Sequence, residues 1–225
     1  ITKVILMGID LHQDLIQKNS QYWNRKPLLR ILYGDFYRLI SKKLSNVPGH
    51  KIVELGSGLG NIKEVIPGCL RTDLFPNPWI DQVENAYKLS FGDGTVSDLI
   101  MTDVFHHLKY PGTALQEFYR VLCKGGRVIM LEPHISALGL LVYGVFHREP
   151  IALTQKIDWL APAGWSPEDI GYYAAQGNGT RIFLGNNFSA ELNPWARIEA
   201  IRLSAFAYAA SGGYSGPQLY PRSLL

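Results

Sequence analysis

Cysteine, methionine and charge are all scarce in this sequence. Its 225 residues include 2 cysteines and 3 methionines, and charged residues make up 18%. The two cysteines, Cys69 and Cys123, lie far apart, each in apolar sequence. These features exclude a disulfide-stabilised scaffold and predict two free thiols in a reducing compartment, the cytoplasm.

Long hydrophobic runs are also absent. The longest, Ile135–Phe146, is well short of the roughly 20 residues that cross a bilayer, so stable membrane insertion is not expected. The first residues, Ile1–Met7, lack the basic leader and cleavage site of a secretory signal. Basic residues exceed acidic ones by only 22 to 19 and are scattered, so nucleic acid is not an expected partner.

Apolar residues, glycine and proline are abundant by contrast. The hydrophobic fraction is 47%, with 22 glycines and 13 prolines, which is typical of a folded globular protein. The length suits a single domain over residues 1–225. We expect N-terminal helices over 1–47, a half that carries the ligand motifs over 48–134, and an aromatic-rich half over 135–225.

The order of the expected elements predicts an α/β fold. Apolar residues at three- and four-residue steps over Leu11–Leu44 indicate two helices separated at Pro27. Strand-like and helical segments then alternate, which indicates βαβ units and a mostly parallel sheet. Strands are expected at Lys51–Leu55, Cys69–Thr72, Ala86–Leu89, Ser97–Thr102 and Arg127–Leu131, and helices from Asn61, at Thr113–Leu122 and at Ile135–Phe146.

The last part of the chain has a looser pattern. Two strand-like runs, Arg181–Leu184 and Arg197–Leu203, predict an antiparallel hairpin at one edge of the sheet. The sequence Lys124-Gly125-Gly126 is expected to end the helix that precedes it.

A glycine loop follows the first expected strand. The sequence Gly56-Ser57-Gly58-Leu59-Gly60 permits a sharp turn and a close approach of the backbone to a ligand. Its spacing is not that of the dinucleotide fingerprint, and no Lys-Ser or Lys-Thr follows to make a phosphate-binding loop. A nicotinamide-dependent reductase is therefore disfavoured.

Two acidic residues accompany this loop. Glu54 precedes it and suits a cation better than a pyrophosphate. Asp73, at the end of the second strand, can accept both hydroxyls of a ribose. A positively charged ligand with a ribose and no phosphate fits S-adenosylmethionine.

Further motifs follow in a fixed order along the chain. They are Val53–Gly60, Thr72–Leu74, Asn85–Leu89, Ser97–Ile100, Asp103–Leu108, Glu117–Leu122, Lys124–Gly126 and Leu131–Pro133. With these motifs the chain resembles the class I S-adenosylmethionine-dependent methyltransferases, in particular the type 11, small-molecule branch. The resemblance implies a Rossmann-like, doubly wound sheet of seven mostly parallel strands, with S-adenosylmethionine as cofactor and S-adenosylhomocysteine as product.

The resemblance also implies roles for individual residues. The loop residues would pass under the methionine and ribose, Glu54 would reach the amino group, and Asp73 would hold the ribose. Asn85 stands where the family usually has an acidic residue that binds the adenine amino group, and its amide oxygen can still accept. The implied cofactor-binding residues are Glu54, Gly56, Ser57, Gly58, Gly60, Asp73, Leu74, Asn85, Ala86 and Thr102.

Three histidines are candidate catalytic bases. His106 and His107 follow the fourth expected strand and His134 follows the fifth, at the strand ends where open α/β sheets bind ligands. Histidine can remove a proton from an acceptor near neutral pH, and methyl transfer requires no metal. One of the paired histidines could instead simply pack and bind backbone.

The acceptor is less defined. The chain has neither the Pro-Pro segment of adenine-amino methyltransferases nor the Pro-Cys nucleophile of cytosine methylation, which disfavours nucleic acid as the acceptor. Aromatic residues after Ile135 suit a small molecule such as a sugar or a lipid-linked metabolite, and equally suit a core. The leading interpretation is methyl transfer to an O or N atom of a small molecule. The alternative is a donor-binding protein without turnover that acts as a partner or regulator, and a homodimer is compatible with either.

Overall fold

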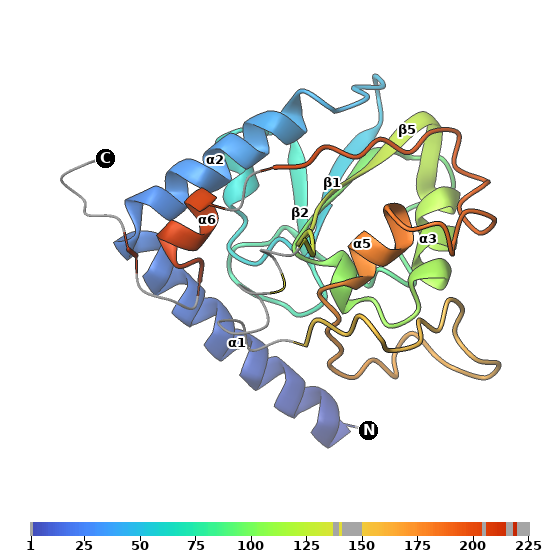
Figure 1. Cartoon of the computed structure of the whole chain (residues 1–225), viewed down its shortest axis with the longest axis horizontal. Helices are drawn as coiled ribbons and strands as arrows, with labels where there is room; N and C mark the ends of the chain where they lie inside the picture. The colour runs from blue at the N-terminus through green and yellow to red at the C-terminus, as the bar shows by residue number, and fades with distance from the viewer. Residues whose placement is uncertain (1, 137–139, 141–149, 204–205, 215–217, 220–225) are drawn as a thin grey trace.

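Five parallel strands form one sheet in the computed structural model, which describes residues 2–136, 140, 150–203, 206–214 and 218–219 (Figure 1). The strand order is β3-β2-β1-β4-β5, and every neighbouring pair is parallel. The strands are β1 (Lys51–Leu55), β2 (Cys69–Asp73), β3 (Gln82–Val83), β4 (Val96–Thr102) and β5 (Leu122–Leu131).

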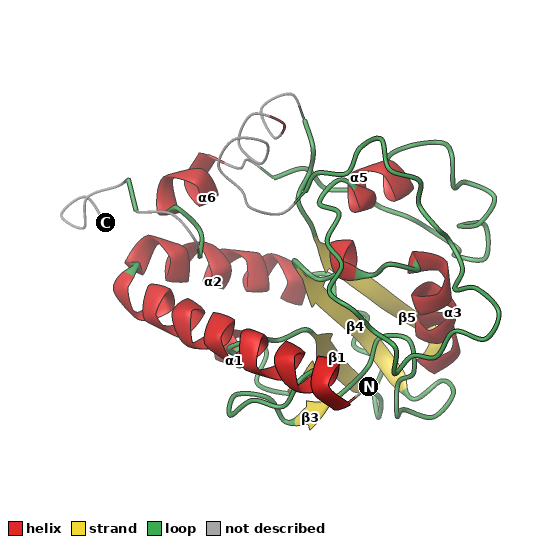
Figure 2. Cartoon of the chain, turned by 90° about the horizontal axis from the view of Figure 1, so that it is seen from below, coloured by secondary structure: helices red, strands yellow, loops and turns green. Residues whose placement is uncertain are grey.

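The helices cover both faces of this sheet (Figure 2). On one side lie α1 (Thr2–Arg25), α2 (Pro27–Ser41) and α6 (Phe206–Ser211). On the other lie α3 (Pro111–Val121) and α5 (Asn178–Phe183). Pro27 occupies the first turn of α2, where its missing N–H costs no hydrogen bond, and so separates α1 from α2 as the sequence predicted.

Alternate strand residues enter two separate cores. In β4, Leu99 and Met101 pack with the apolar side of α3, while Ile100 packs with Tyr37 and Ile40 of α2. All three β4 residues have no exposed surface. A strand buried on both faces requires apolar side chains in both directions, which explains the continuous apolar run in β4.

The order in which the chain adds strands to the sheet changes direction at β1. From β1 the chain moves to β2 and β3, and it then returns to β4 on the other side of β1. At such a switch point the loops after neighbouring strands diverge and leave a crevice at the carboxyl ends. The loops after β1 and β4 therefore define the place where a ligand is expected.

The predicted edge hairpin is wrong, and the described residues form five strands rather than seven. Arg181 and its neighbours belong to α5, because a helical period buries Ile182 completely in the core and lets Arg181 donate to the Ala152 carbonyl oxygen at 2.9 Å. The second run, Arg197–Leu203, has no regular secondary structure.

Two other predicted elements also differ. The helix from Asn61 is a single 3₁₀ turn, Asn61–Glu64, because Pro67-Gly68 follows too soon for a longer helix. The strand predicted at Ala86–Leu89 is a turn, in which the Asn85 side chain accepts a hydrogen bond from the N–H of Tyr87 at 3.0 Å.

The other predicted strands agree within two residues, except that β5 begins earlier than Arg127. Lys124-Gly125-Gly126 does follow the end of α3, but it lies within β5, where Gly125 has a φ of 83° and the register with β4 shifts. The predicted helix Ile135–Phe146 lies almost wholly outside the described residues. In the described part of the chain, no helix has the length and apolar character needed to cross a membrane.

Asp98 of β4 offers a test of this fold. It is fully buried, and its carboxylate accepts hydrogen bonds from the Ser45 N–H at 2.7 Å and the Ser45 hydroxyl at 3.0 Å. Asp98→Ala leaves these donors without an acceptor, and we expect it to lower the free energy of unfolding by about 2–4 kcal/mol in urea titration. Asp93→Ala is the control, because Asp93 is 80% exposed in its pair with Arg120 and should cost at most about 1 kcal/mol. Equal losses in the two variants would contradict this account.

Candidate active site

The glycine loop after β1 has three residues in the left-handed region: Gly56, Gly58 and Gly60, with φ of 69°, 52° and 65°. A Cβ atom at Gly56 would lie 2.4 Å from Cγ2 of Val104, and one at Gly60 would lie 2.5 Å from the Trp79 carbonyl oxygen. A Cβ atom at Gly58 would meet no described atom within 4 Å. Gly56 and Gly60 are therefore required for packing, whereas Gly58 borders open space.

Hydrogen bonds hold this loop against β2. The Ser57 N–H donates to the Thr72 carbonyl oxygen at 2.8 Å, and the Thr72 N–H donates to the Ser57 hydroxyl at 3.1 Å. The Gly58 N–H donates to Oδ2 of Asp73 at 3.0 Å. Ser57 thus has a structural role beside its predicted contact with a ligand, and the Asp73 carboxylate lies directly against the loop.

The carboxyl group of Glu54 is buried away from water. Its side chain is 2% exposed, and burial raises its pKa to about 8; the nearby Asp73 adds to this rise, while Ser57 and Arg71 oppose it. Among the described residues, Oε2 of Glu54 has no hydrogen-bond partner. The carboxyl group is therefore mostly neutral at pH 7, and a cation placed beside it would favour its charged form.

The residues predicted to surround an adenine lie on the loops after β2 and β3. Leu74, Asn85 and Ala86 are all half-buried. Asn85 Nδ2 donates to the Pro167 carbonyl oxygen at 2.8 Å, and Oδ1 accepts from Tyr87. The Asn85 amide fixes one loop to another, and its contact with adenine stays a prediction.

The loop after β4 is strained at Asp103. This residue has a φ of 57°, which is unusual for a residue other than glycine, and its Oδ2 accepts a hydrogen bond from the Tyr33 hydroxyl at 3.2 Å. Next to it, the buried Oγ1 of Thr102 has no partner within the described part of the chain. The loops after β1 and β4 thus both present polar atoms at the switch point.

His106 lies in the interior rather than at the surface of the site. It is 2% exposed, with Nδ1 2.7 Å from Oε2 of Glu132 and Nε2 3.3 Å from Nε2 of Gln176. The other Glu132 oxygen accepts from the N–H groups of Val104 and Phe105 at 2.9 and 2.6 Å. The geometry suits a residue that fixes the loop after β4 better than a base that contacts an acceptor.

The other two histidines are placed differently. Nδ1 of His107 lies 2.8 Å from the Tyr173 carbonyl oxygen, and its ring packs against Tyr172 at 5.8 Å between centroids. His134, after β5, is half-buried and lines a groove of about 1110 Å³. Of the three predicted bases, His134 is the one that faces this volume.

The groove runs along the edge strand β5 and is lined by residues of α2 on one face of the sheet and of α3 and α5 on the other. One end is lined by Asp103, Glu132 and His134, and the middle by apolar residues such as Phe36 and Ile129. Its remaining charged lining residues are Lys42, Lys43, Arg127, Arg197, Glu199 and Arg202. The groove is therefore acidic at the carboxyl ends of the strands and mainly basic elsewhere, and it is large enough for a small-molecule ligand.

Sequence reasoning missed two residues of the site. Glu132 was placed in a motif but given no role, although a carboxylate directly after a strand is the same signal that identified Asp73. Tyr33 could not be found in this way, because it reaches Asp103 from α2 across 70 positions of sequence.

Residues 68–130 match the family model described as "Methyltransferase domain", a little over a quarter of the chain. A curated relative, "Probable polyketide synthase 10" of Dictyostelium discoideum, is 30% identical over 50 residues, which is 22% of this chain and 2% of that protein. The chain thus spans a very small part of that relative's length.

Two solved structures are similar over about half of the chain or more. One from Thermotoga maritima, described as a SAM-dependent methyltransferase and possible histamine N-methyltransferase, is 18% identical, with a TM-score of 0.49 over 62% of this chain and 69% of that chain. The other, a Haloferax volcanii complex of a methyltransferase and its activator, is 17% identical, with a TM-score of 0.41 over 54% and 58%. The family match over residues 68–130 confirms the resemblance to S-adenosylmethionine-dependent methyltransferases inferred from the motifs, a family whose cofactor is S-adenosylmethionine and whose product is S-adenosylhomocysteine.

Proposed function

We propose that the chain binds S-adenosylmethionine at the glycine loop and transfers its methyl group to an O or N atom of a small molecule held in the groove along β5. One observation carries this proposal. Glu54, the penultimate residue of the strand that leads to the open space at Gly58, has a buried carboxyl group with an oxygen that lacks a partner among the described residues. A cationic ligand beside Glu54 explains both features.

The residues present fit this cofactor. Asp73 lies within hydrogen-bond distance of the loop and would hold the ribose hydroxyls, while Glu54 would face the amino group. Leu74 and Ala86 offer apolar surface to the adenine. When bound, S-adenosylmethionine supplies a methyl group on a cationic sulfur that leaves as a neutral thioether.

The chain itself would orient the acceptor and exclude water. The Glu132 carboxylate holds the loop after β4 through two backbone N–H groups, which fixes the position of Asp103 beside the groove. His134 would accept a proton from a hydroxyl or ammonium group of the acceptor through a ring nitrogen. Alignment in a dry pocket is the main contribution that a protein makes to such a displacement.

The shape of the groove favours an elongated acceptor. Arg127 of β5 and Glu132, directly after β5, are five residues apart, so the groove beside them extends about 17 Å at the usual rise of a strand. Its apolar middle and mainly basic outer lining suit a molecule with an apolar body and an anionic group, such as a lipid-linked metabolite or a sugar phosphate.

Donor binding is the first test of this proposal. We expect the wild-type chain to bind S-adenosylhomocysteine in calorimetry. Gly58→Ala should weaken this binding at least tenfold with a stability loss of about 1 kcal/mol, because its methyl group fills open space that the ligand needs. Gly56→Ala is the matched variant, since the same φ strain is joined by a clash with Val104, and it should cost about 2–4 kcal/mol of stability. A wild-type chain that binds no adenosyl compound would overturn the proposal.

The pKa of Glu54 predicts how donor binding depends on pH. The free protein holds the Glu54 proton up to about pH 8, whereas a cationic ligand requires the carboxylate. The affinity for S-adenosylmethionine should therefore rise by up to about tenfold per pH unit between pH 6 and 8 and then level off, with proton release on binding. Glu54→Gln should bind weakly without this dependence, and a wild-type affinity that is flat over the range would contradict the prediction.

The same shift predicts a stability effect. Because the folded pKa lies above the unfolded value of 4.5, the native state retains a proton that the unfolded state loses. The contribution of Glu54 to the free energy of unfolding is thus complete below about pH 4.5 and decreases as the pH rises toward 8. Glu54→Gln should remove this decrease in urea titrations at several pH values.

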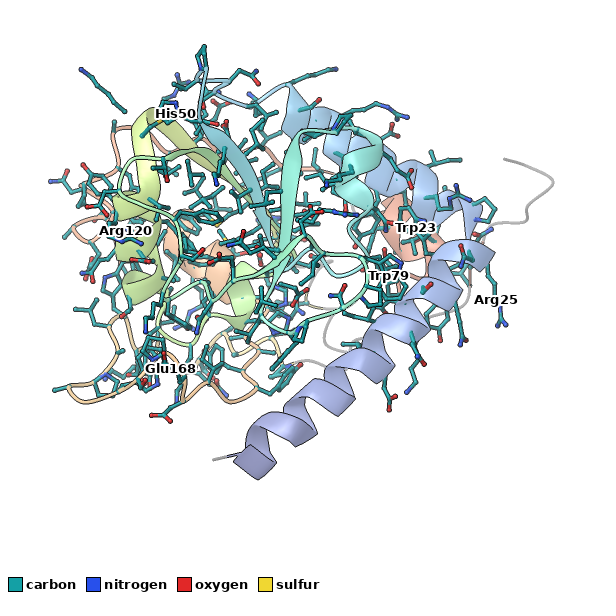
Figure 3. The ribbon with its side chains drawn as sticks, turned by 180° about the vertical axis from the view of Figure 1, so that it is seen from behind. Trp23, Arg25, His50, Trp79, Arg120 and Glu168 are labelled. Carbon is teal, nitrogen blue, oxygen red and sulfur yellow. The ribbon has the colours of Figure 1, made fainter. Side chains whose placement is uncertain are left out.

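His134 provides a test of turnover. We expect His134→Asn to reduce methyl transfer from radiolabelled donor to a protein-free metabolite extract by about 10²–10⁴-fold, with the Kd for S-adenosylhomocysteine unchanged. His50→Asn is the control, because His50 directly precedes β1 and lies at the amino ends of the strands, away from the carboxyl ends where the site is (Figure 3). Full turnover in His134→Asn would exclude it as the base. Donor binding by the wild-type chain without any transfer would instead favour a regulatory partner.

A further inference from the structure

The part of the groove between β5 and α2, which we call the lane, has two well-defined ends. At the carboxyl ends of the strands, the Tyr33 hydroxyl of α2 donates to Asp103. At the amino end of β5, Arg127 donates to the carbonyl oxygen of Lys43, just beyond the last turn of α2. Tyr33 and Lys43 are ten residues apart, about 15 Å at the rise of a helix, so α2 and β5 independently give the lane a similar length.

The middle of the lane is apolar. Phe36 and Leu39 of α2 line it together with Ile129 of β5, and all three are half-buried, so each leaves apolar surface to the groove. The charged residues of α2 that lie between its ends, Asp35 and Arg38, do not line the groove. An alkyl or isoprenoid chain fits this stretch because it meets no charge that it would desolvate.

Basic residues gather where the lane reaches the amino end of β5. We call this the basic end, and the residues that form it are Lys42, Lys43, Arg127 and Arg197. They share one carboxylate, that of Glu199, which lies 2.9 Å from Nζ of Lys43 and 3.5 Å from Arg197. Within the described part of the chain, the Lys42 ammonium group has no partner and the Arg127 guanidinium has no carboxylate partner. The basic end therefore carries excess positive charge beside the groove.

The opposite end of the lane carries the opposite charge. Asp103 and Glu132 line the groove there, next to His134. An anionic group is repelled by these carboxylates and attracted to the basic end. A long molecule with one anionic end thus has one favoured direction in the lane.

We infer that the lane binds an elongated anionic amphiphile, with its carboxylate or phosphate at the basic end and its apolar body along α2 and β5. The inference rests on the proposed function, because the far end of this molecule would be the group that receives the methyl near His134. It adds a second binding site at the amino ends of the strands. The acceptor class is then a molecule in which about 15 Å of apolar chain separates an anionic group from the methylated oxygen or nitrogen.

Calorimetry with simple amphiphiles tests the site. We expect the wild-type chain to bind decanoate and decyl phosphate at one site, below the concentrations at which they form micelles, and the tighter of the two identifies the preferred anionic group. Butanoate should bind at least about a hundredfold more weakly than decanoate, because it buries far fewer CH₂ groups. Decyltrimethylammonium has the same apolar chain and the opposite charge, and equal affinity for it would overturn the inference.

Single substitutions test the basic end. Arg127→Gln and Lys42→Gln should each raise the Kd for decanoate about fivefold to tenfold, because each removes one charged contact with the anionic group. Both side chains are exposed, so the variants should fold as the wild type does. Lys124→Gln is the matched control, since Lys124 is an exposed basic residue of β5 that does not line the groove. Equal losses in Arg127→Gln and Lys124→Gln would contradict a specific site.

A photoreactive ligand tests the direction of binding. Decanoate with a diazirine at the end of its chain should, on irradiation, label Asp103 or the segment 131–136, as located by mass spectrometry of the digested protein. Labelling at Lys42, Lys43 or Arg197 would mean that the molecule lies the other way round, and would overturn the proposed role of the basic end.

Failure of this inference differs from failure of the proposed function. If the wild-type chain binds S-adenosylhomocysteine but none of the anionic amphiphiles, the donor site stands and the basic end is not a binding site. If it binds decanoate in the expected direction but no adenosyl compound, the lane is a binding site and the proposed methyl transfer is wrong.

Discussion

The desolvated carboxyl group of Glu54 is the constraint on which the site depends. It lies near the end of a central strand that is buried on both faces. In such a place the carboxyl group is stable only when it is protonated or when a cation lies beside it. A protein gains no stability from such a group, since an apolar side chain would pack there at lower cost. Its presence supports the proposed binding of a cation, and the open space at Gly58 is where we propose that the ligand lies.

Two carboxylates at strand ends divide the remaining tasks. Asp73, the last residue of β2, accepts from the backbone of the glycine loop, and Glu132, directly after β5, accepts from the backbone of the loop after β4. Each hydrogen bond joins a loop to the end of the adjacent strand. Both sides of the crevice are therefore held in the same way, by a carboxylate that accepts from backbone N–H groups. His106 lies between Glu132 and Gln176 and contacts both through its two ring nitrogens. These contacts explain why His106 is buried.

Local sequence was sufficient for β1, the glycine loop and the parallel direction of the central strands, because a short β-branched run that ends abruptly at glycine and alternating strand and helix segments are both local signals. It failed where partners far along the chain decide the structure. The run around Arg181 reads as a strand, but a core contact of Ile182 and a bond to Ala152 select a helix. The sequence gives no reason to distinguish His106 from His107, yet the contact with Glu132 holds His106 in the interior.

The same limit explains why the acceptor side of the molecule is harder to read than the donor side. The segment that matches the family, 68–130, supplies strands and strand ends but neither Tyr33 nor the Tyr214 ring that packs against it. Tyr33 comes from α2 and Tyr214 from the turn after α6, and these two segments meet where Lys26 donates to the carbonyl oxygens of Gly212 and Gly213. Helices and tails outside the sheet can vary without disturbing it, so selectivity for an acceptor can change while the glycine loop and its carboxylates stay in place.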